Sequence, residues 1–205
     1  MFKNYTLEDF LDKTASNDPT PGGGSIAATC GAIAYSLTEM VANLSLNKEK
    51  YAEFQVQFEE LVEKTNTLRN ELLLDIDRDA SSFDEVMKAF KLPKATDEEK
   101  KARSAKIQEG YKYAASVPMG IAEKIYNSLE LIEFVVNNGN KNALTDGLVA
   151  LMSARTAILG ALLNVRINLG SIKDTSFVED YTEKANTLEA KAIEFEQRVL
   201  QNNKL

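Results

Sequence analysis

The 205-residue sequence predicts an all-α protein that forms a single domain over residues 1–205. Apolar residues recur every three or four positions over long stretches, as they do on the buried side of a helix. The four prolines and ten glycines fall mostly in a few clusters, so long helices can run between short turns. No segment alternates apolar and polar residues as a strand would. We therefore expect a bundle of about six helices.

The first half of the chain predicts three of these helices. Thr6 is the expected N-cap of a short helix, because an acidic residue follows three positions later in a variant of the capping box. The segment N-D-P-T-P-G-G-G at residues 17–24 interrupts the chain, and a second helix is expected from Ser25 to Leu46. A long third helix is expected from Glu49 to Phe90, with one apolar stripe along its length.

The segment L-P-K at residues 92–94 ends the third helix. Thr96 then caps a fourth helix, whose first turn carries three acidic residues where the helix dipole favours them. This helix is expected to reach Val136. Because Pro118 lies inside it, we expect a kink or a brief break at that residue.

Two more helices complete the predicted bundle. After a turn rich in asparagine at residues 137–142, the fifth helix spans residues 143–172. The sixth runs from Asp174 to near the end of the chain. Some of these helices are long enough to pair across a dimer.

The composition excludes several classes of function. A net charge of −7 without a basic run argues against binding to nucleic acid or to an anionic membrane. The chain has no histidine, which excludes histidine-ligated zinc and Ser-His-Asp catalysis. Cys30 is the one cysteine and is interpreted as a core residue. Together with a charged N-terminal stretch that lacks a signal-peptide pattern, it favours a cytoplasmic protein.

Two apolar stretches, at residues 25–46 and 143–163, are long enough to resemble membrane spans. The first contains Glu39, and the second contains Asp146 and Arg155. Charged side chains are costly inside a bilayer, so we interpret both stretches as buried helices.

The turn P-T-P-G-G-G-S at residues 19–25 is the first candidate for chemistry. Gly22, Gly23 and Gly24 allow positive φ angles and let the backbone approach a ligand closely. Ser25 follows at a helix N-terminus, where free N–H groups favour a carboxylate, a phosphate or a developing oxyanion. A tight turn between helices, with Ser25 as its cap, explains the same residues equally well.

Two carboxylates of the third helix are the second candidate. At 100° per residue, Asp79 falls in the middle of the apolar stripe, and Asp75 lies on its flank one turn earlier. A carboxylate that faces a core is costly unless it is paired or used, and burial moves its pKa towards the range useful for acid–base catalysis. A structural ion pair is the alternative.

The third candidate is one face of the fifth helix, which is small and polar. It comprises Asp146, Ala150, Ser153, Ala157, Ala161, Asn164 and Asn168. The second helix has a matching face of small and polar residues. The two faces could pack together as a hydrogen-bonded seam, or they could line a cleft that recognises the donors and acceptors of a heterocycle.

Several sequence blocks resemble one enzyme family. They are F-L-D-K-T-A-S-N-D-P-T-P-G-G-G-S from Phe10, D-I-D-R-D-A-S-S-F-D-E-V-M-K-A-F-K-L-P-K from Asp75, A-A-S-V-P from Ala114, G-N-K-N-A-L-T-D-G-L-V-A from Gly139 and L-L-N-V-R-I-N-L from Leu162. They are similar to the formiminotetrahydrofolate cyclodeaminase / methenyltetrahydrofolate cyclohydrolase family. Lys141 departs mildly from the family pattern, which often has proline there.

The resemblance implies an all-α homodimer with a folate cleft at or near the subunit interface. It implies hydrolysis of 5,10-methenyltetrahydrofolate to 10-formyltetrahydrofolate, or alternatively ring closure of 5-formiminotetrahydrofolate with release of ammonia. The absence of a formiminotransferase domain in this sequence favours the cyclohydrolase. A folate-binding helical module without catalysis, and a structural protein without folate affinity, are further alternatives. The resemblance implies no metal and no tightly bound cofactor.

On this hypothesis the candidate residues take roles in folate chemistry. Asp79 is the first candidate for the general base and Asp146 the second. Asn164 and Asn168 would orient the pterin ring, and the turn at residues 22–25 would bind the developing oxygen or a pterin edge. Asp75 would also bind the substrate, and Lys94 and Arg103 would contact the glutamate tail of the folate.

Overall fold

A computed structural model describes residues 1–203 of the chain, and within them every regular element is a helix. The α-helices are α1 (Leu7–Thr14), α2 (Gly23–Asn43), α3 (Gln55–Phe90), α4 (Asp97–Tyr126), α5 (Leu129–Asn138), α6 (Leu144–Leu169) and α7 (Thr175–Asn202). Three short 3-10 helices, η1 (Phe2–Asn4), η2 (Glu49–Phe54) and η3 (Lys141–Ala143), lie between them. The predicted all-α fold is confirmed.

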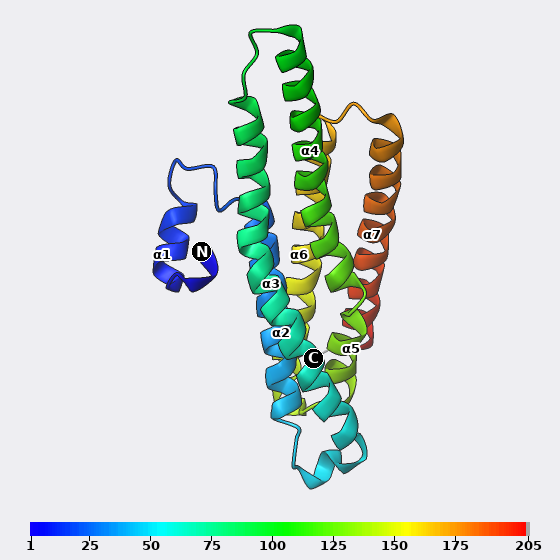
Figure 1. Cartoon of the computed structure of the whole chain (residues 1–205). Helices are drawn as coiled ribbons and strands as arrows, with labels where there is room; N and C mark the ends of the chain where they lie inside the picture. The colour runs from blue at the N-terminus through cyan, green and yellow to red at the C-terminus, as the bar shows by residue number, and fades with distance from the viewer. Residues whose placement is uncertain (204–205) are drawn as a thin grey trace.

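The helices α2, α3, α4 and α6 form the body of the molecule (Figure 1). α2 packs against both α3 and α6, and α4 packs against both α3 and α6. α7 lies along the outer side of α6, whereas α1 stands away from the bundle (Figure 1). α2 and α6 are antiparallel, because Gly23 lies against Asn164 at one end and Leu44 accepts a hydrogen bond from Asn140 at the other.

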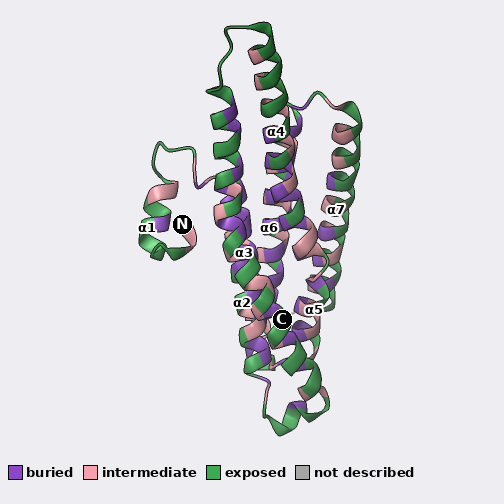
Figure 2. Cartoon of the chain, viewed as in Figure 1, coloured by how far each residue is buried: buried purple, intermediate pink, exposed green. Residues whose placement is uncertain are grey.

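Small residues let α2 and α6 approach closely. Ala28, Ala34, Ala150, Ala157 and Ala161 are fully buried. Buried residues of the bundle lie on the sides of the helices that face one another (Figure 2). The hydroxyls of Thr29 and Ser36 bond back to carbonyls of α2 itself. The predicted small, polar face of α2 does not meet that of α6, however: Ser25 bonds to Ile76 and Asp79 of α3, and Glu39 pairs with Arg69 of α3. The predicted seam between these two faces was wrong, and α2 meets α6 through other residues, such as Gly23 and Ala27.

The predicted fourth helix is two helices, and its break is not at the predicted place. α4 runs through Pro118 to Tyr126, and the chain is interrupted at residues 127–128 before α5 begins. Proline at position 118 cannot donate to the carbonyl of Ala114 one turn earlier. The side-chain amide of Asn168 donates to that carbonyl instead, at 2.9 Å. The freed acceptor is thus satisfied from α6, and the helix continues.

The third helix also begins later than predicted. Residues 49–54 form η2, in which Tyr51 has φ −118° and ψ 22°, and the α-helix begins at Gln55. The Tyr51 hydroxyl accepts a hydrogen bond from the backbone N–H of Lys141. Tyr51 is buried by this contact with the turn before α6, and that tertiary contact favours the non-helical backbone.

Two helical segments, Gly23–Asn43 and Lys141–Leu169, are long and apolar enough to cross a membrane by length and hydropathy alone. In the apolar 18-residue window of each segment, 56% and 50% of the residues are buried inside the bundle. The apolar residues of these segments therefore lie partly in the core of the bundle and partly on its surface.

Candidate active site

Asp79 of α3 lies against the first turn of α2. The Ser25 hydroxyl is 3.0 Å from Oδ2 of Asp79 and 3.0 Å from the backbone oxygen of Ile76. The backbone N–H of Ser25 also favours the ionised form of the Asp79 carboxylate and so lowers its pKa. The carboxylate thus faces the N-terminal end of α2, where free N–H groups and the helix dipole favour negative charge.

The glycines of the turn permit this close approach. A Cβ atom on Gly24 would stand 2.5 Å from Cγ and 2.7 Å from Oδ2 of Asp79. A Cβ on Gly23 would lie 3.0 Å from the Asn164 amide nitrogen. Gly22 is the N-cap of α2, with φ −113° and ψ −160°, and within residues 1–203 no glycine has a positive φ. The prediction of positive φ angles was wrong: close contact with side chains is the reason for glycine here.

Burial raises the pKa of the Asp79 carboxyl above its ordinary value. The hydrogen bonds from Ser25 oppose this rise, and the negative charge of Asp75 adds to it. Asp79 is nonetheless partly accessible, and Gly23 beside it is exposed. A carboxyl group with a raised pKa that can reach a ligand is suited to accepting and returning a proton near neutral pH.

Asp75 is engaged by its own protein. Its side chain is 3% exposed, with Lys124 at 2.7 Å from Oδ2 and Arg78 bonded to Oδ1. Lys124 also pairs with Glu71 at 3.0 Å. Since both oxygens of Asp75 are occupied, it forms the structural ion pair that was the alternative to substrate binding. The negative charge of Asp75 raises the pKa of Asp79, which lies one turn away on α3.

The two asparagines of α6 have different surroundings. Asn164 lies beside Gly23 and donates to the carbonyl of Gly160, and its side chain is partly exposed next to the α2 N-terminus. Asn168 donates to Ala114 and to the carbonyl of Asn164. Asn164 therefore belongs to the surface around Asp79, whereas the amide hydrogens of Asn168 stabilise the helix around Pro118.

A family model described as formiminotransferase-cyclodeaminase matches residues 6–187, which include Asp79, the α2 N-terminus and Asn164. The chain belongs to this family.

Three relatives of this cyclodeaminase-family chain are informative. It is 41% identical to a methenyltetrahydrofolate cyclohydrolase of Methylorubrum extorquens, over 100% of this chain and 98% of that one. It is 30% identical to the formimidoyltransferase-cyclodeaminase of Sus scrofa, covering 89% of this chain but 34% of that longer protein. The crystal structure of a formiminotetrahydrofolate cyclodeaminase from Thermotoga maritima superposes with a TM-score of 0.88, at 31% identity, over 99% of this chain and 98% of that chain.

Two predicted site residues, Asp146 and Lys94, lie far from Asp79 within one chain. Eighteen residues of α6 separate Asp146 from Asn164, which at 1.5 Å per residue is about 27 Å. Asp146 therefore cannot share a pocket with Asp79 in one chain. Lys94 is exposed in the loop after α3, and the α3 segment from Asp79 to Phe90 is about 17 Å long.

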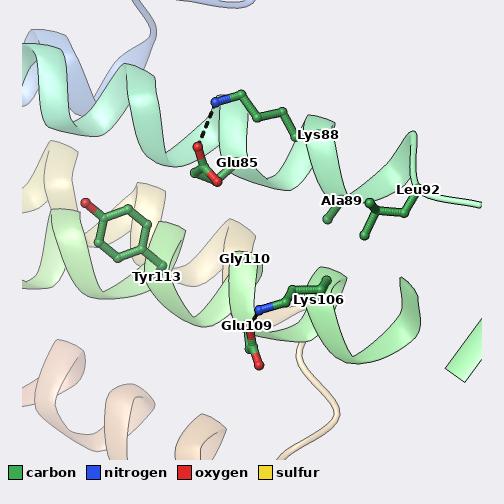
Figure 3. A pocket seen from close by; sticks show the side chains of 8 residues that line it. All are labelled: Glu85, Lys88, Ala89, Leu92, Lys106, Glu109, Gly110 and Tyr113. Atoms are coloured by element: carbon green, nitrogen blue, oxygen red, sulfur yellow. Dashed lines mark hydrogen bonds and ion pairs between the residues drawn. The ribbon is translucent and has the colours of Figure 1, made fainter. Parts of the chain in front are cut away.

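A groove between α3 and α4 extends along the C-terminal part of α3 (Figure 3). Its volume is about 350 Å³, and it is lined by Glu85, Lys88, Ala89, Leu92, Lys106, Glu109, Gly110 and Tyr113. Gly110 allows the helices to meet, because a Cβ there would already lie 3.3 Å from Val86. This groove was missed by the sequence analysis, and the glycine inside a charged helix was the available signal.

The acidic side chains of the described residues do not form a metal centre. Within residues 1–203 no group of three or more aspartate, glutamate or cysteine side chains converges so as to hold a metal ion. The candidate site consists of one carboxyl group, a helix N-terminus and an amide, which together can move a proton and stabilise a developing oxyanion.

Proposed function

We propose that this protein is a methenyltetrahydrofolate cyclohydrolase that binds its folate against Asp79, Asn164 and the N-terminus of α2. The observation that carries the proposal is a partly accessible carboxyl of raised pKa held by Ser25 at a helix N-terminus. Likeness to a cyclohydrolase over the whole chain supports it. The proposed reaction needs no metal and no tightly bound cofactor.

The proposed reaction adds water to the methenyl carbon between N5 and N10 of the pterin. Asp79 accepts one proton as the water oxygen bonds to this cationic carbon. In the tetrahedral intermediate that results, Asp79 returns the proton to N5 while the bond from N5 to the carbon breaks. The hydroxyl proton leaves to solvent, and the formyl group remains on N10. The N–H groups at the start of α2 stabilise the oxygen as negative charge develops.

The second candidate function is that of a formiminotetrahydrofolate cyclodeaminase. Likeness to a solved structure of that name over 99% of the chain favours it. In that reaction N10 attacks the formimino carbon, and the N10 proton passes to the imino nitrogen. Asp79 in its protonated form then donates a second proton as the bond from the carbon to this nitrogen breaks and ammonia leaves. The two reactions share the same carbon and the same position of the carboxyl group.

The glutamate tail of the folate is proposed to extend towards the α3–α4 connection. Eight basic and four acidic side chains lie between Lys88 and Lys112, so this segment is positive in a chain of net charge −7. Because Lys94 is exposed there whereas Arg103 is engaged by the backbone carbonyl of Phe90, Lys94 is the better candidate for the tail carboxylates.

A cytoplasmic homodimer is the proposed assembly, joined through what we term the α2–α6 face. This face comprises the exposed apolar residues of the two helices and of the α2 C-cap: Ile33, Met40, Leu44, Val149, Met152, Leu163 and Ile167. The chain exposes 11148 Å² of surface. A compact monomer of 22.7 kDa would expose about 9,500 Å². The excess is larger than the roughly 800 Å² that each partner contributes to a standard interface.

A parallel assay with both folates tests the proposed function. Loss of the methenyl chromophore faster than the uncatalysed rate identifies the cyclohydrolase, and its formation from the formimino substrate identifies the cyclodeaminase. Binding of folate without either change would show a non-catalytic module and overturn the proposal.

The Asp79→Asn variant tests the role of the carboxylate. We expect turnover to fall by about 10²-fold or more, since a positioned general base contributes that much. Asp84→Asn, which removes an exposed carboxylate from the same helix, is the matched control and should retain turnover. Near-normal turnover in Asp79→Asn would remove this residue from the mechanism.

A further inference from the structure

The side of α3 that faces α2 continues past the point where α2 begins. Arg69 and Ile76 of α3 bond to side chains of α2, and Asp79 bonds to Ser25 in the first turn of α2. α3 then runs on to Phe90, about 17 Å further along its axis. This last part of α3 lies beyond the N-terminal end of α2.

The residues on this side of α3 beyond Asp79 are apolar and exposed. At 100° per residue, Phe83 and Met87 lie about 40° and 80° from Asp79, in the same direction as Arg69 and Ile76. Phe83 is 37% exposed and Met87 is 42% exposed. We call these two residues the Phe83–Met87 platform. It continues the surface of the candidate site along α3.

Phe90 extends the same line, but its ring already contacts side chains of the protein. The Arg103 guanidinium lies 5.5 Å from the centre of the Phe90 ring, and the Tyr111 ring meets its edge with 6.3 Å between centroids. Within residues 1–203, Phe83 has no such aromatic or cation–π contact. The Phe83 ring is therefore the one on this line that remains available to a ligand.

The groove of Figure 3 lies on another side of α3. Its lining residues Glu85 and Lys88 lie about 120° and 180° from Asp79 around the helix. Lys88 pairs with Glu85, and Lys106 across the groove pairs with Glu109. The platform, rather than this groove, is the surface that adjoins Asp79.

We propose that the aminobenzoyl ring of the bound folate packs on the Phe83–Met87 platform. This inference rests on the proposed function. The benzene ring of a folate is attached to N10, so its centre lies about 4 Å from the reacting carbon. Phe83 lies about 6 Å beyond Asp79 along α3, and Met87 lies about 12 Å beyond it. A ring at the level of Phe83 therefore leaves the reacting carbon beside Asp79.

The charge of the chain fixes the direction in which the substrate lies. Towards its N-terminus, α3 is covered by α2, which excludes a ligand from that side. In the other direction the platform leads to the positive segment between Lys88 and Lys112, where Lys94 is exposed. The pterin ring then lies at Asp79 and Asn164, and the glutamate carboxylates lie towards Lys94.

Phe83 and Met87 are positioning residues in this arrangement, because they contact the substrate away from the reacting atoms. An aromatic ring gains a stacked or edge-to-face contact with phenylalanine, and the thioether of methionine also favours an aromatic partner. The contact is the same before and during the reaction, so its loss should raise KM and leave kcat nearly unaltered.

Two probes measured by titration calorimetry separate the ring contact from the pterin site. The first is 5-formyltetrahydrofolate, and the second is 6-methyltetrahydropterin, which lacks the aminobenzoylglutamate. Phe83→Ala should raise the Kd of 5-formyltetrahydrofolate by about tenfold and leave that of the pterin unaltered. Met87→Ala should raise the Kd of the folate by about threefold.

Two further variants serve as controls. Phe83→Tyr keeps the ring and should retain the Kd of both probes. Leu74→Ala removes an apolar side chain of the same helix that is 44% exposed but lies about 140° from Asp79, and it should also retain both values.

An unaltered Kd of 5-formyltetrahydrofolate in Phe83→Ala would overturn the proposal, and so would an equal loss of affinity for both probes. A change of oligomeric state in sedimentation velocity, with folate affinity retained, would assign the platform to a protein contact and overturn it as well. A wild-type protein that neither binds 5-formyltetrahydrofolate nor turns over either substrate would overturn the proposed function together with this inference. Wild-type turnover combined with an unaltered Kd in Phe83→Ala would overturn this inference alone.

Discussion

Gly24→Ala adds one methyl group at the point where α2 meets the Asp79 carboxylate. The new Cβ would stand 2.5 Å from Cγ of Asp79, whereas ordinary contacts of this kind begin near 3.4 Å. The carboxylate or the first turn of α2 must therefore move by about 1 Å. Misplacement of this size can lower the rate of an enzyme by about 10²-fold. We expect kcat/KM to fall by about that factor.

The stability of this variant follows from two opposing terms. Overpacking of a close contact costs about 1–3 kcal/mol, and alanine is favoured over glycine in a helix by up to about 1 kcal/mol. We therefore expect the free energy of unfolding to fall by about 1 kcal/mol in urea denaturation. The loss of activity should be much larger than this loss of stability explains, because the folded fraction stays close to one.

Gly120→Ala is the matched control for Gly24→Ala. Gly120 is exposed in α4, and a Cβ built there meets no atom within 4 Å. This variant should be more stable than the wild type by about 0.5–1 kcal/mol, with unaltered kcat/KM. A Gly24→Ala enzyme with kcat/KM within threefold of the wild type would refute the assignment of Asp79 and the α2 N-terminus to one site.

Three further predictions concern stability. Burial raises the pKa of Asp79 in the folded protein, so ionisation of this carboxyl lowers the free energy of unfolding as pH rises through the folded-state pKa. Asp79→Asn should therefore be more stable than the wild type near pH 7 and equal to it below pH 3.8. A larger gain in stability at pH 4 than at pH 7 in urea titrations would contradict this. Asn168→Leu should cost about 2 kcal/mol by leaving the Ala114 carbonyl unpaired, and clearly less in a Pro118→Ala background, where residue 118 regains its N–H donor; equal costs in both backgrounds would disprove the link. Lys124→Met should cost roughly 3 kcal/mol in urea unfolding by breaking the buried pair with Asp75, and a loss below 1 kcal/mol would show that Arg78 suffices alone.

Local signals in the sequence were sufficient for most of the helices. Thr6 and Thr96 both act as N-caps in the structure, as their spacing to the following acidic residue predicts. The period of the α3 stripe predicts that Asp79 turns inwards, and the carboxyl group is indeed largely buried against α2. These features depend on residues within one or two turns of each other, so the sequence alone contains the necessary information.

Features that depend on two distant segments were not predictable in this way. Pro118 interrupts no helix, because Asn168, fifty residues later, satisfies the carbonyl that proline leaves free. The glycines at residues 23–24 looked suited to positive φ angles, but neither has one. Glycine is needed there because Asp79 of α3 and Asn164 of α6 leave no room for a Cβ atom. Asp75 and Asp79 look alike one turn apart. Asp75 pairs with Arg78 of the same helix, but its second partner, Lys124 of α4, is placed only by the tertiary structure.

The sequence by itself determined the helical class, most helix boundaries and the inward direction of Asp79, because helix periodicity and capping are local properties. Tertiary structure decided which polar groups meet. It placed Asp79 at the α2 N-terminus and put Asp146 at the far end of α6, about 27 Å from Asn164. The physical reason is that one helical face extends along the whole element, so residues can share a face and still be too far apart to act together.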